Sequence, residues 1–341
     1  MRILICTTQV PFVRGGTETL TEGLCTALRT AGHAAEVVAL PFQWSPRANI
    51  LRGALAWRLL DLEAVDGVPI DMVIATKFPS YAVRHPRKVV WLVHQHRQAY
   101  DWYGTALSDW GAQADDQAAR ARLMRLDRRT LGEAQGLYAI SRNVANRLRQ
   151  YNGLQATTLY PPSHLAPLLH TGPYGDYLLS AARLDRAKRI DLLLYALAQA
   201  DSSLHVIISG DGPERRQLEA LAQQLGLRER VHFAGYVNDQ ELVELYAGCR
   251  GVFYAPVDED YGLATVEAFA AAKPVLTTTD AGGVLEFVVD GVSGLVVAPA
   301  ARVLANSIAS LTAERATALG HNNPQRVATL SWERVLAALL N

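Results

Sequence analysis

Short apolar runs alternate with helical patterns twice along this chain, and that repetition limits its fold more than any other feature. In the first half, the buried-strand candidates are residues 2–7, 37–40, 72–75, 89–93 and 136–140. Continuous apolar runs separated by helices are typical of parallel sheets that are covered on both faces. The first half therefore predicts a doubly wound α/β domain.

A proline-rich break separates this series from a second one. Tyr160-Pro161-Pro162 ends the first series, and the segment 163–175 has the composition of a linker. Beyond it, strand candidates recur at 177–182, 204–209, 231–234, 251–255, 274–278 and 294–297. We expect two Rossmann-like domains, an N-terminal one over 1–163 and a C-terminal one over 174–325.

Composition narrows the class of protein. With 341 residues, 50% of them apolar, the chain can fill the cores of two domains of ordinary size. No uncharged apolar run approaches the ~18 residues that a membrane span needs, so we expect a cytoplasmic protein. The 3 cysteines stand in apolar segments, which indicates reduced buried thiols. We see no cluster of metal ligands and predict no metal.

The net charge of zero hides an asymmetry between the two halves. Residues 1–163 hold 19 Lys and Arg against 13 Asp and Glu, a balance of +6, and the remainder holds 14 against 20, a balance of −6. The basic residues of the first half gather in two segments, one with Arg47, Arg52 and Arg58 and one with Arg120, Arg122, Arg125, Arg128 and Arg129. Each segment fits an anionic membrane surface, a phosphate-bearing acceptor or a solvated helix face.

The segment 258–269 carries the most informative motif. It reads DEDYGLATVEAF, with Glu259 and Glu267 eight positions apart around a Tyr-Gly-Leu turn. Gly262 lets backbone N–H groups approach a ligand closely, and the helix that follows directs its positive end to the same place, which suits a phosphate. Glu267, about one turn inside the helix, fits a ribose, and Glu259 is placed to face a sugar. For an isolated pair, two solvated acids on a helix are the alternative.

Two cations follow the first strand of the second half. Ligands bind at the carboxyl ends of strands in such sheets. Arg183 can present a planar fork to phosphate oxygens, and Lys188 adds a point charge five residues later. Together they would offset the charge of a nucleoside diphosphate, although a surface loop with two cations is also consistent with the pattern.

Two further turns lie after the next strands. Gly210 belongs to Ser-Gly-Asp-Gly-Pro over 209–213, where glycines permit a tight turn near a nucleotide. This is not the G-x-G-x-x-G fingerprint of NAD enzymes, which argues against an NAD-dependent oxidoreductase. Tyr236 and Val237 follow the strand at 231–234, and packing explains these side chains as well as a ligand does.

The first half contributes a glycine loop and a histidine. Gly15 and Gly16 separate the first strand from a helix expected over 17–29, but many turns between a strand and a helix carry glycines. His94 stands at the end of the strand candidate 89–93. A lone histidine is usually a packed core residue, whereas a position at the end of a strand favours a role in a ligand-binding site.

Taken in order, these motifs resemble those of the retaining glycosyltransferases of family 4, among the glycosyl transferases group 1, which have the GT-B fold. Glu259 and Glu267 match the E-x7-E signature of that family. Arg183 and Lys188 match its G-R-L…K motif, with Ala182 where glycine is usual.

The resemblance assigns roles to these residues. It implies that Arg183 and Lys188 bind the diphosphate, Glu259 the donor-sugar hydroxyls and Glu267 the ribose. Further donor-site residues implied by the matching motifs are Gly15, Gly16, Gly210, Tyr236, Val237, Tyr261, Gly262, Leu263 and Ala264. His94 matches the histidine that contacts the donor sugar, and Glu259, His94, Arg183 and Lys188 form the expected catalytic set.

The resemblance also implies a reaction and its partners. We expect metal-independent transfer of a sugar, with retention, from a nucleoside-diphosphate donor, UDP-sugars being favoured over GDP-sugars. The expected acceptor is a glycan or a lipid-linked sugar in surface polysaccharide or glycoconjugate synthesis, with no cofactor and no nucleic acid. The segment 326–341 would pack back on the N-terminal domain. A peripheral position at the inner face of the cell membrane, and a non-catalytic protein that binds nucleotide sugars, both remain open.

Overall fold

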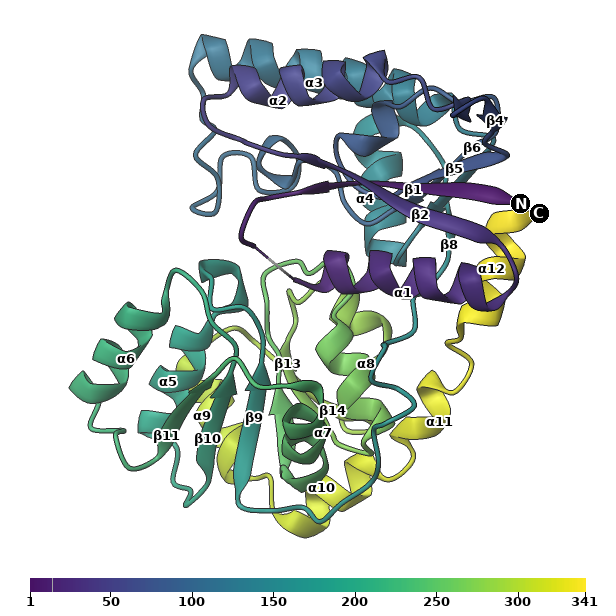
Figure 1. Cartoon of the computed structure of the whole chain (residues 1–341). Helices are drawn as coiled ribbons and strands as arrows, with labels where there is room; N and C mark the ends of the chain where they lie inside the picture. Colours follow the sequence, from purple (N-terminus) through teal and green to yellow (C-terminus); the bar gives the residue numbers. More distant parts are fainter. Residues whose placement is uncertain (14) are drawn as a thin grey trace. The chain divides into compact units, whose positions relative to one another are not determined.

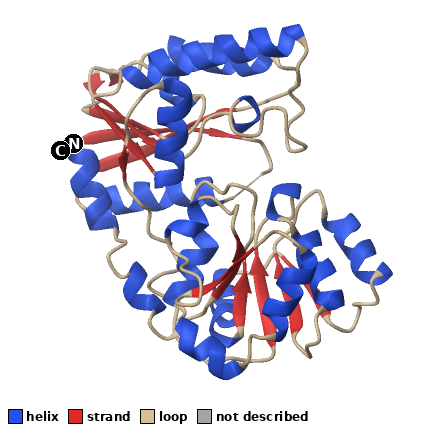
Figure 2. Cartoon of the chain, turned by 180° about the vertical axis from the view of Figure 1, so that it is seen from behind, coloured by secondary structure: helices blue, strands red, loops and turns tan. Residues whose placement is uncertain are grey.

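The computed structural model describes residues 1–13 and 15–341, which form two compact units. Unit 1 comprises Met1–Pro161 and Ser331–Asn341, and unit 2 comprises Pro162–Leu330. Each unit contains a parallel six-stranded sheet with helices on both faces (Figures 1 and 2). The predicted fold class, two doubly wound α/β units of the GT-B type, is confirmed.

Unit 1 is wound outward from its first strand. Its parallel strands are β1 (Arg2–Gln9), β2 (Ala34–Pro41), β5 (Met72–Ala75), β6 (Lys88–Leu92), β7 (Gly136–Ala139) and β8 (Thr157–Thr158). They lie in the order β2-β1-β5-β6-β7-β8, so the winding reverses between β1 and β5. A small antiparallel hairpin, β3 (Ala64–Val65) with β4 (Val68–Pro69), stands outside this sheet.

Among the residues that the structure describes, five α-helices belong to unit 1. They are α1 (Gly16–Thr30), α2 (Ala48–Leu59), α3 (Ala114–Gly132), α4 (Arg142–Asn152) and α12 (Trp332–Leu340), and two short 3-10 turns, η1 (Ser80–Ala82) and η2 (Arg97–Ala99), lie between them. The helix α12 comes from the end of the chain. Trp332 lies edge-to-face on Trp91, with ring centroids 6.3 Å apart, and the Tyr138 hydroxyl donates to the carbonyl of Ala338 over 2.7 Å.

Unit 2 has the strand order of dinucleotide-binding domains. Its strands are β9 (Tyr177–Ala181), β10 (His205–Ser209), β11 (Val231–Gly235), β12 (Gly251–Phe253), β13 (Val275–Thr278) and β14 (Gly294–Val297). They are parallel and lie in the order β11-β10-β9-β12-β13-β14, so the winding reverses between β9 and β12. Ligands bind beyond the carboxyl ends of the strands at such a reversal.

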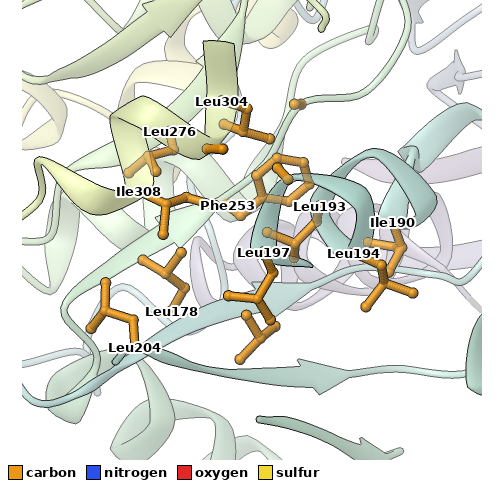
Figure 3. Close-up of a cluster of buried hydrophobic side chains, with 14 of the residues drawn as sticks. Leu178, Ile190, Leu193, Leu194, Leu197, Leu204, Phe253, Leu276, Leu304 and Ile308 are labelled. Atoms are coloured by element: carbon orange, nitrogen blue, oxygen red, sulfur yellow. The ribbon is translucent and has the colours of Figure 1, made fainter. Parts of the chain in front are cut away.

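The helices of unit 2 are α5 (Ile190–Gln199), α6 (Arg215–Gln224), α7 (Asp239–Gly248), α8 (Leu263–Ala270), α9 (Ala301–Ala309), α10 (Ala313–Gly320) and α11 (Asn323–Val327), with the 3-10 turns η3 (Arg186–Lys188) and η4 (Gly283–Glu286). Figure 3 shows how the leucines of α5 pack with Phe253 of β12 and with Leu304 and Ile308 of α9. This apolar cluster holds the sheet beneath the loops that carry the motifs.

In the part of the chain that the structure describes, none of the helices is long and apolar enough to cross a membrane. All three cysteines are buried and unpaired by disulfides. Burial raises the pKa of the Cys6 and Cys249 thiols to about 12, so these groups stay protonated.

Candidate active site

The motif residues of unit 2 gather where the winding of its sheet reverses. Arg183 and Lys188 follow β9, and Glu259 follows β12, its neighbour in the sheet. Because parallel strands end at the same edge, segments 75 or so residues apart in the sequence meet there. The sequence-predicted residues of these two segments are therefore brought together.

Lys188 and Glu259 form an ion pair at this edge. The Lys188 ammonium contacts the Glu259 carboxylate, donates to the Tyr254 hydroxyl over 3.1 Å and lies over the Tyr254 ring. Burial alone would lower the pKa of Lys188, but the charge of Glu259 outweighs it, so the pKa is raised and the side chain stays cationic. Arg183, in contrast, is exposed on the loop after β9.

Arg189, for which the sequence predicts no role, joins three loops of the site. Its backbone is left-handed, with φ of 51°, and its guanidinium donates to the carbonyls of Ala255 and Pro256. It also forms a bidentate pair with Asp280, at 2.8 and 2.9 Å. Burial opposes ionisation of Asp280, but hydrogen bonds from Arg189 and Thr278 outweigh it and lower the pKa of that carboxyl.

The loop that carries Glu259 is fixed by the loop after β13. The Asp258 N–H donates to the carbonyl of Asp280 over 2.9 Å, and the Gly283 N–H donates to the carbonyl of Glu259 over 2.7 Å. A side chain at Gly283 would come within 2.6 Å of the Asp260 carbonyl. Only glycine permits this backbone approach, so Gly283 helps to hold Glu259 in place.

Gly210 holds the loop after β10 against the loop after β9. Its φ is 121°, and a Cβ there would lie 2.1 Å from the carbonyl oxygen of Ala182. Its N–H donates to the carbonyl of Gly235 over 2.7 Å, just before Tyr236 and Val237. Tyr236 is highly exposed and Val237 is half-buried. Gly210 therefore supports the loops that follow three neighbouring strands.

The turn before α8 has the geometry of an anion site. Gly262 stands at the N-terminus of α8 with φ of 90°, and a Cβ there would press on Val284 and Tyr254. Leu263 and Ala264 follow in the first turn, where backbone N–H groups have no partner inside the helix. Tyr261 is 3% exposed and its ring packs edge-to-face on Phe287, so its side chain belongs to the core.

Glu267 lies inside α8 with both carboxylate oxygens hydrogen-bonded. The Ser163 hydroxyl donates to Oε1 and the Tyr246 hydroxyl donates to Oε2, both over 2.8 Å. Burial raises the pKa of Glu267, and these two hydrogen bonds oppose that rise. Ser163 stands at the start of the predicted linker. Tyr246 was not predicted as a site residue, because its position inside α7 is typical of a core residue.

In unit 1 the glycine loop lies where its own sheet reverses. Gly15 precedes α1, and its N–H donates to the Glu18 carboxylate over 2.9 Å. The same carboxylate pairs with Lys77, which follows β5, at 2.8 Å. Gly16 is the first residue of α1. The ion pair between Glu18 and Lys77 thus joins the two loops that flank the reversal.

His94 follows β6 and is half-buried. Its Nδ1 lies 2.7 Å from the carbonyl oxygen of Gln95. The neighbouring His96 packs against Phe78 and Trp110, and burial lowers its pKa to about 4, so that it is neutral at pH 7. The assignment of His94 to the donor sugar remains a prediction.

Across residues 1–13 and 15–341, no three His, Cys, Asp or Glu side chains are arranged to hold a metal ion. The carboxylates near Lys188 are instead bonded to cations and hydroxyls. Cations and backbone N–H groups are thus the groups at this edge that can meet an anion.

Comparison with known proteins finds a family match within unit 2. Residues 174–326 match the model of the family described as glycosyl transferases group 1. Unit 2 belongs to this family. The group 1 resemblance seen in the motifs is thereby confirmed, and the matched range contains Arg183, Lys188, Glu259 and Glu267.

Curated relatives of this chain extend the comparison. A Campylobacter jejuni N-acetylgalactosaminyltransferase, named for a diphospho-undecaprenol acceptor, is 31% identical over 121 residues, which is 36% of this chain and 33% of that protein. The chain spans about a third to a half of the length of the curated relatives it matches.

Two solved structures share the whole fold. Sucrose-phosphate synthase from Thermosynechococcus elongatus aligns with 100% of this chain and 97% of its own, with a TM-score of 0.77 and 21% identity. Anabaena HepE, solved with UDP and glucose, aligns with 100% and 99%, with a TM-score of 0.72 and 21% identity. These likenesses support the GT-B fold.

Proposed function

We propose that this protein is a retaining, metal-independent glycosyltransferase that moves a sugar from a nucleoside diphosphate to an acceptor hydroxyl. The observation that carries the proposal is the ion pair of Lys188 and Glu259, which lies where the sheet of unit 2 reverses. The N-terminus of α8 follows the same loop. A cation, a carboxylate and backbone N–H groups are what a diphosphate linked to a sugar requires.

Lys188 would exchange its partner when the donor binds. It is mostly buried, and its raised pKa keeps it cationic, so a diphosphate oxygen is a favourable partner for it. Glu259 would then turn its carboxylate to the hydroxyls of the donor sugar. The exposed Arg183 would add a second cation, and the N–H groups of Leu263 and Ala264 would complete the anion site.

Glu267 would hold the ribose, and its hydrogen-bond partners leave capacity for this. Each carboxylate oxygen accepts one hydrogen bond, from Ser163 or from Tyr246. An ionised carboxylate has about four acceptor positions, so both ribose hydroxyls can still donate to it. Ser163 and Tyr246 are then positioning residues that fix the direction of the carboxylate.

The chemical step needs no separate base. The bond between the anomeric carbon and the departing phosphate oxygen breaks, and a bond to the acceptor oxygen forms on the same face of the sugar. The proton of the acceptor hydroxyl passes to the departing phosphate oxygen. Lys188, Arg183 and the N–H groups before α8 would stabilise the charge that develops on the diphosphate, which is the term expected to dominate.

For the substrates we propose a UDP-sugar, in preference to a GDP-sugar, and a glycan or lipid-linked acceptor. HepE was solved with UDP and glucose, and the Campylobacter relative is named for an undecaprenol-linked acceptor. The protein would act in the cytoplasm, at the inner face of the cell membrane, in surface polysaccharide or glycoconjugate synthesis.

Slow hydrolysis of the donor tests this function without knowledge of the acceptor. We expect UDP release from at least one UDP-sugar to continue in EDTA, and proton NMR to show that the first sugar released has the donor's anomeric configuration. Release of the opposite anomer would contradict the retaining mechanism. Binding of the nucleotide with no release from any sugar, even when glycan and lipid acceptors are supplied, would identify a non-catalytic binding protein.

A further inference from the structure

The helices α2 and α3 of unit 1 form one layer that is tied together at both ends. Arg47, just before α2, pairs with Asp116 in the first turn of α3. Arg58, in the last turn of α2, holds Glu133 just after α3 through two bonds of 2.5 and 2.6 Å. The two helices therefore run side by side along the edge of unit 1, as Figure 1 shows.

The outer face of α2 carries exposed leucines beside one exposed arginine, Arg52. Ile50, Ala54 and Trp57 point inward and are buried. Leu51, Leu55 and Leu59 recur every four residues on another face, and Leu55 and Leu59 are 56% and 76% exposed. An apolar stripe is usually the face that a helix buries, so one left in water indicates a surface that meets something apolar.

The outer face of α3 is basic. Its residues Leu123, Asp127 and Leu131 are buried, and the helix packs against α4 and η1. On the opposite side, Arg122, Arg125, Arg128 and Arg129 are exposed. The acids Asp115, Glu133 and Asp61 lie at the ends of the two helices or beyond them. Glu133 is paired with Arg58 and also lies 3.7 Å from Arg129, so Arg122, Arg125 and Arg128 carry most of the positive charge of this face.

We propose that these two faces dock unit 1 on an anionic lipid bilayer. The arginines of α3 would lie among the phosphates of the headgroups, and the leucines of α2 would enter the boundary of the acyl chains. A soluble acceptor with phosphate groups would account for the arginines but not for the leucines. This proposal rests on the proposed function, because a lipid-linked acceptor would be held in the bilayer on which unit 1 docks.

Vesicle sedimentation of the full chain, without any nucleotide sugar, tests the proposal. We expect binding to vesicles with 30 mol% phosphatidylglycerol, weakening as salt rises, and little binding to pure phosphatidylcholine. Neutralising one arginine near the surface weakens such binding about fivefold, corresponding to about 1 kcal/mol. The double variant R122Q/R125Q should therefore bind about 25-fold more weakly. The control R216Q/R228Q removes the same charge from exposed positions of unit 2 and should bind unchanged.

The leucines are tested separately. L55S/L59S should bind at least tenfold more weakly at constant charge, whereas L168S, at an exposed leucine of unit 2, should bind normally. Circular dichroism checks that each variant folds, which is expected because the replaced side chains are exposed.

Three results would overturn the proposal. One is no binding to anionic vesicles, and the second is equal losses in R122Q/R125Q and its control. The third is a pair of observations: soluble polyphosphate competes with vesicles for the protein, and L55S/L59S binds vesicles normally. The arginines would then form a site for phosphate polymers. The proposed sugar transfer would survive each of these results, because donor hydrolysis in solution does not involve the bilayer, whereas the proposed position at the membrane would not.

Discussion

Single residues at the reversal of unit 2 carry two tasks, because the groups that would bind the donor also bind one another. Lys188 and Glu259 neutralise each other at the edge of the sheet, and Glu267 is held by Ser163 and Tyr246. Such pairing keeps buried charges stable and directs them before a substrate arrives. Variants at these positions therefore separate binding from turnover.

Glu259→Gln keeps the shape of the side chain and removes its charge. We expect kcat for donor hydrolysis or transfer to fall at least 100-fold, because the amide cannot replace the carboxylate toward the sugar hydroxyls. The Kd for UDP should stay within about threefold, since UDP lacks the sugar. Glu241→Gln, on the exposed surface of α7, is the matched control. Unchanged turnover in Glu259→Gln would remove Glu259 from the mechanism.

Asp127 makes the stability of unit 1 depend on pH. It is fully buried on α3 and accepts a hydrogen bond from the Tyr100 hydroxyl over 2.6 Å, and burial raises its pKa to about 7. The folded state thus binds a proton between pH 4 and 7 that the unfolded state releases. Asp127 therefore makes the free energy of unfolding fall as pH rises through that window, by up to about 1.4 kcal/mol per unit.

Asp127→Asn should remove this contribution. We expect chemical denaturation at several pH values to show the variant gaining stability relative to the wild type from pH 4 to pH 7, with no further gain above pH 8. A difference between the two proteins that stays constant across the whole range would show that the carboxyl does not titrate there.

At the scale of elements, close backbone contacts between loops set the positions of the motifs. Gly210 touches the loop after β9, and Gly283 touches the loop that carries Glu259. The sequence indicated that a glycine was needed for a tight turn at Gly210, but not which backbone it would meet, and it gave no such indication for Gly283. Those partners are far apart in the sequence, and only the sheet order brings them together.

Gly210→Ala tests this packing. At φ of 121° with 2.1 Å to the Ala182 carbonyl, a methyl group forces the two loops apart, and we expect a loss of about 3 kcal/mol in the free energy of unfolding. The control is Gly111→Ala, where a Cβ meets nothing within 4 Å, and it should change stability by less than about 0.5 kcal/mol. Equal effects of the two substitutions would contradict the packing account.

The strands show how far sequence predicts elements. The runs 72–75 and 294–297 match β5 and β14 residue for residue, because buried parallel strands read as continuous apolar runs. The strand β8 and the hairpin of β3 and β4 were not predicted. Each of these strands has two residues, too few for any periodicity to appear.

At the scale of the whole molecule, the repeated α/β pattern was enough to predict two doubly wound units. The site residues at the reversal of unit 2 could be predicted from the sequence because the motifs stand in the family's order and follow the ends of predicted strands. Ser163, Tyr246 and Arg189 could not, since a serine in a linker, a tyrosine in a helix and one arginine among several carry no local signal of their partners. Their roles arise from contacts between segments 21 to 104 residues apart.

The central claim is that unit 2 binds a nucleoside diphosphate through Lys188 and the turn before α8. Isothermal titration calorimetry of the full chain against UDP, GDP and ADP tests it most directly, with Lys188→Ala and Glu267→Ala as variants and Arg216→Ala as an exposed control. We predict that UDP binds most tightly, that each of the two variants weakens this binding at least tenfold, and that the control binds like the wild type. Binding of none of the three nucleotides, or equal affinity in all the variants, would contradict the account.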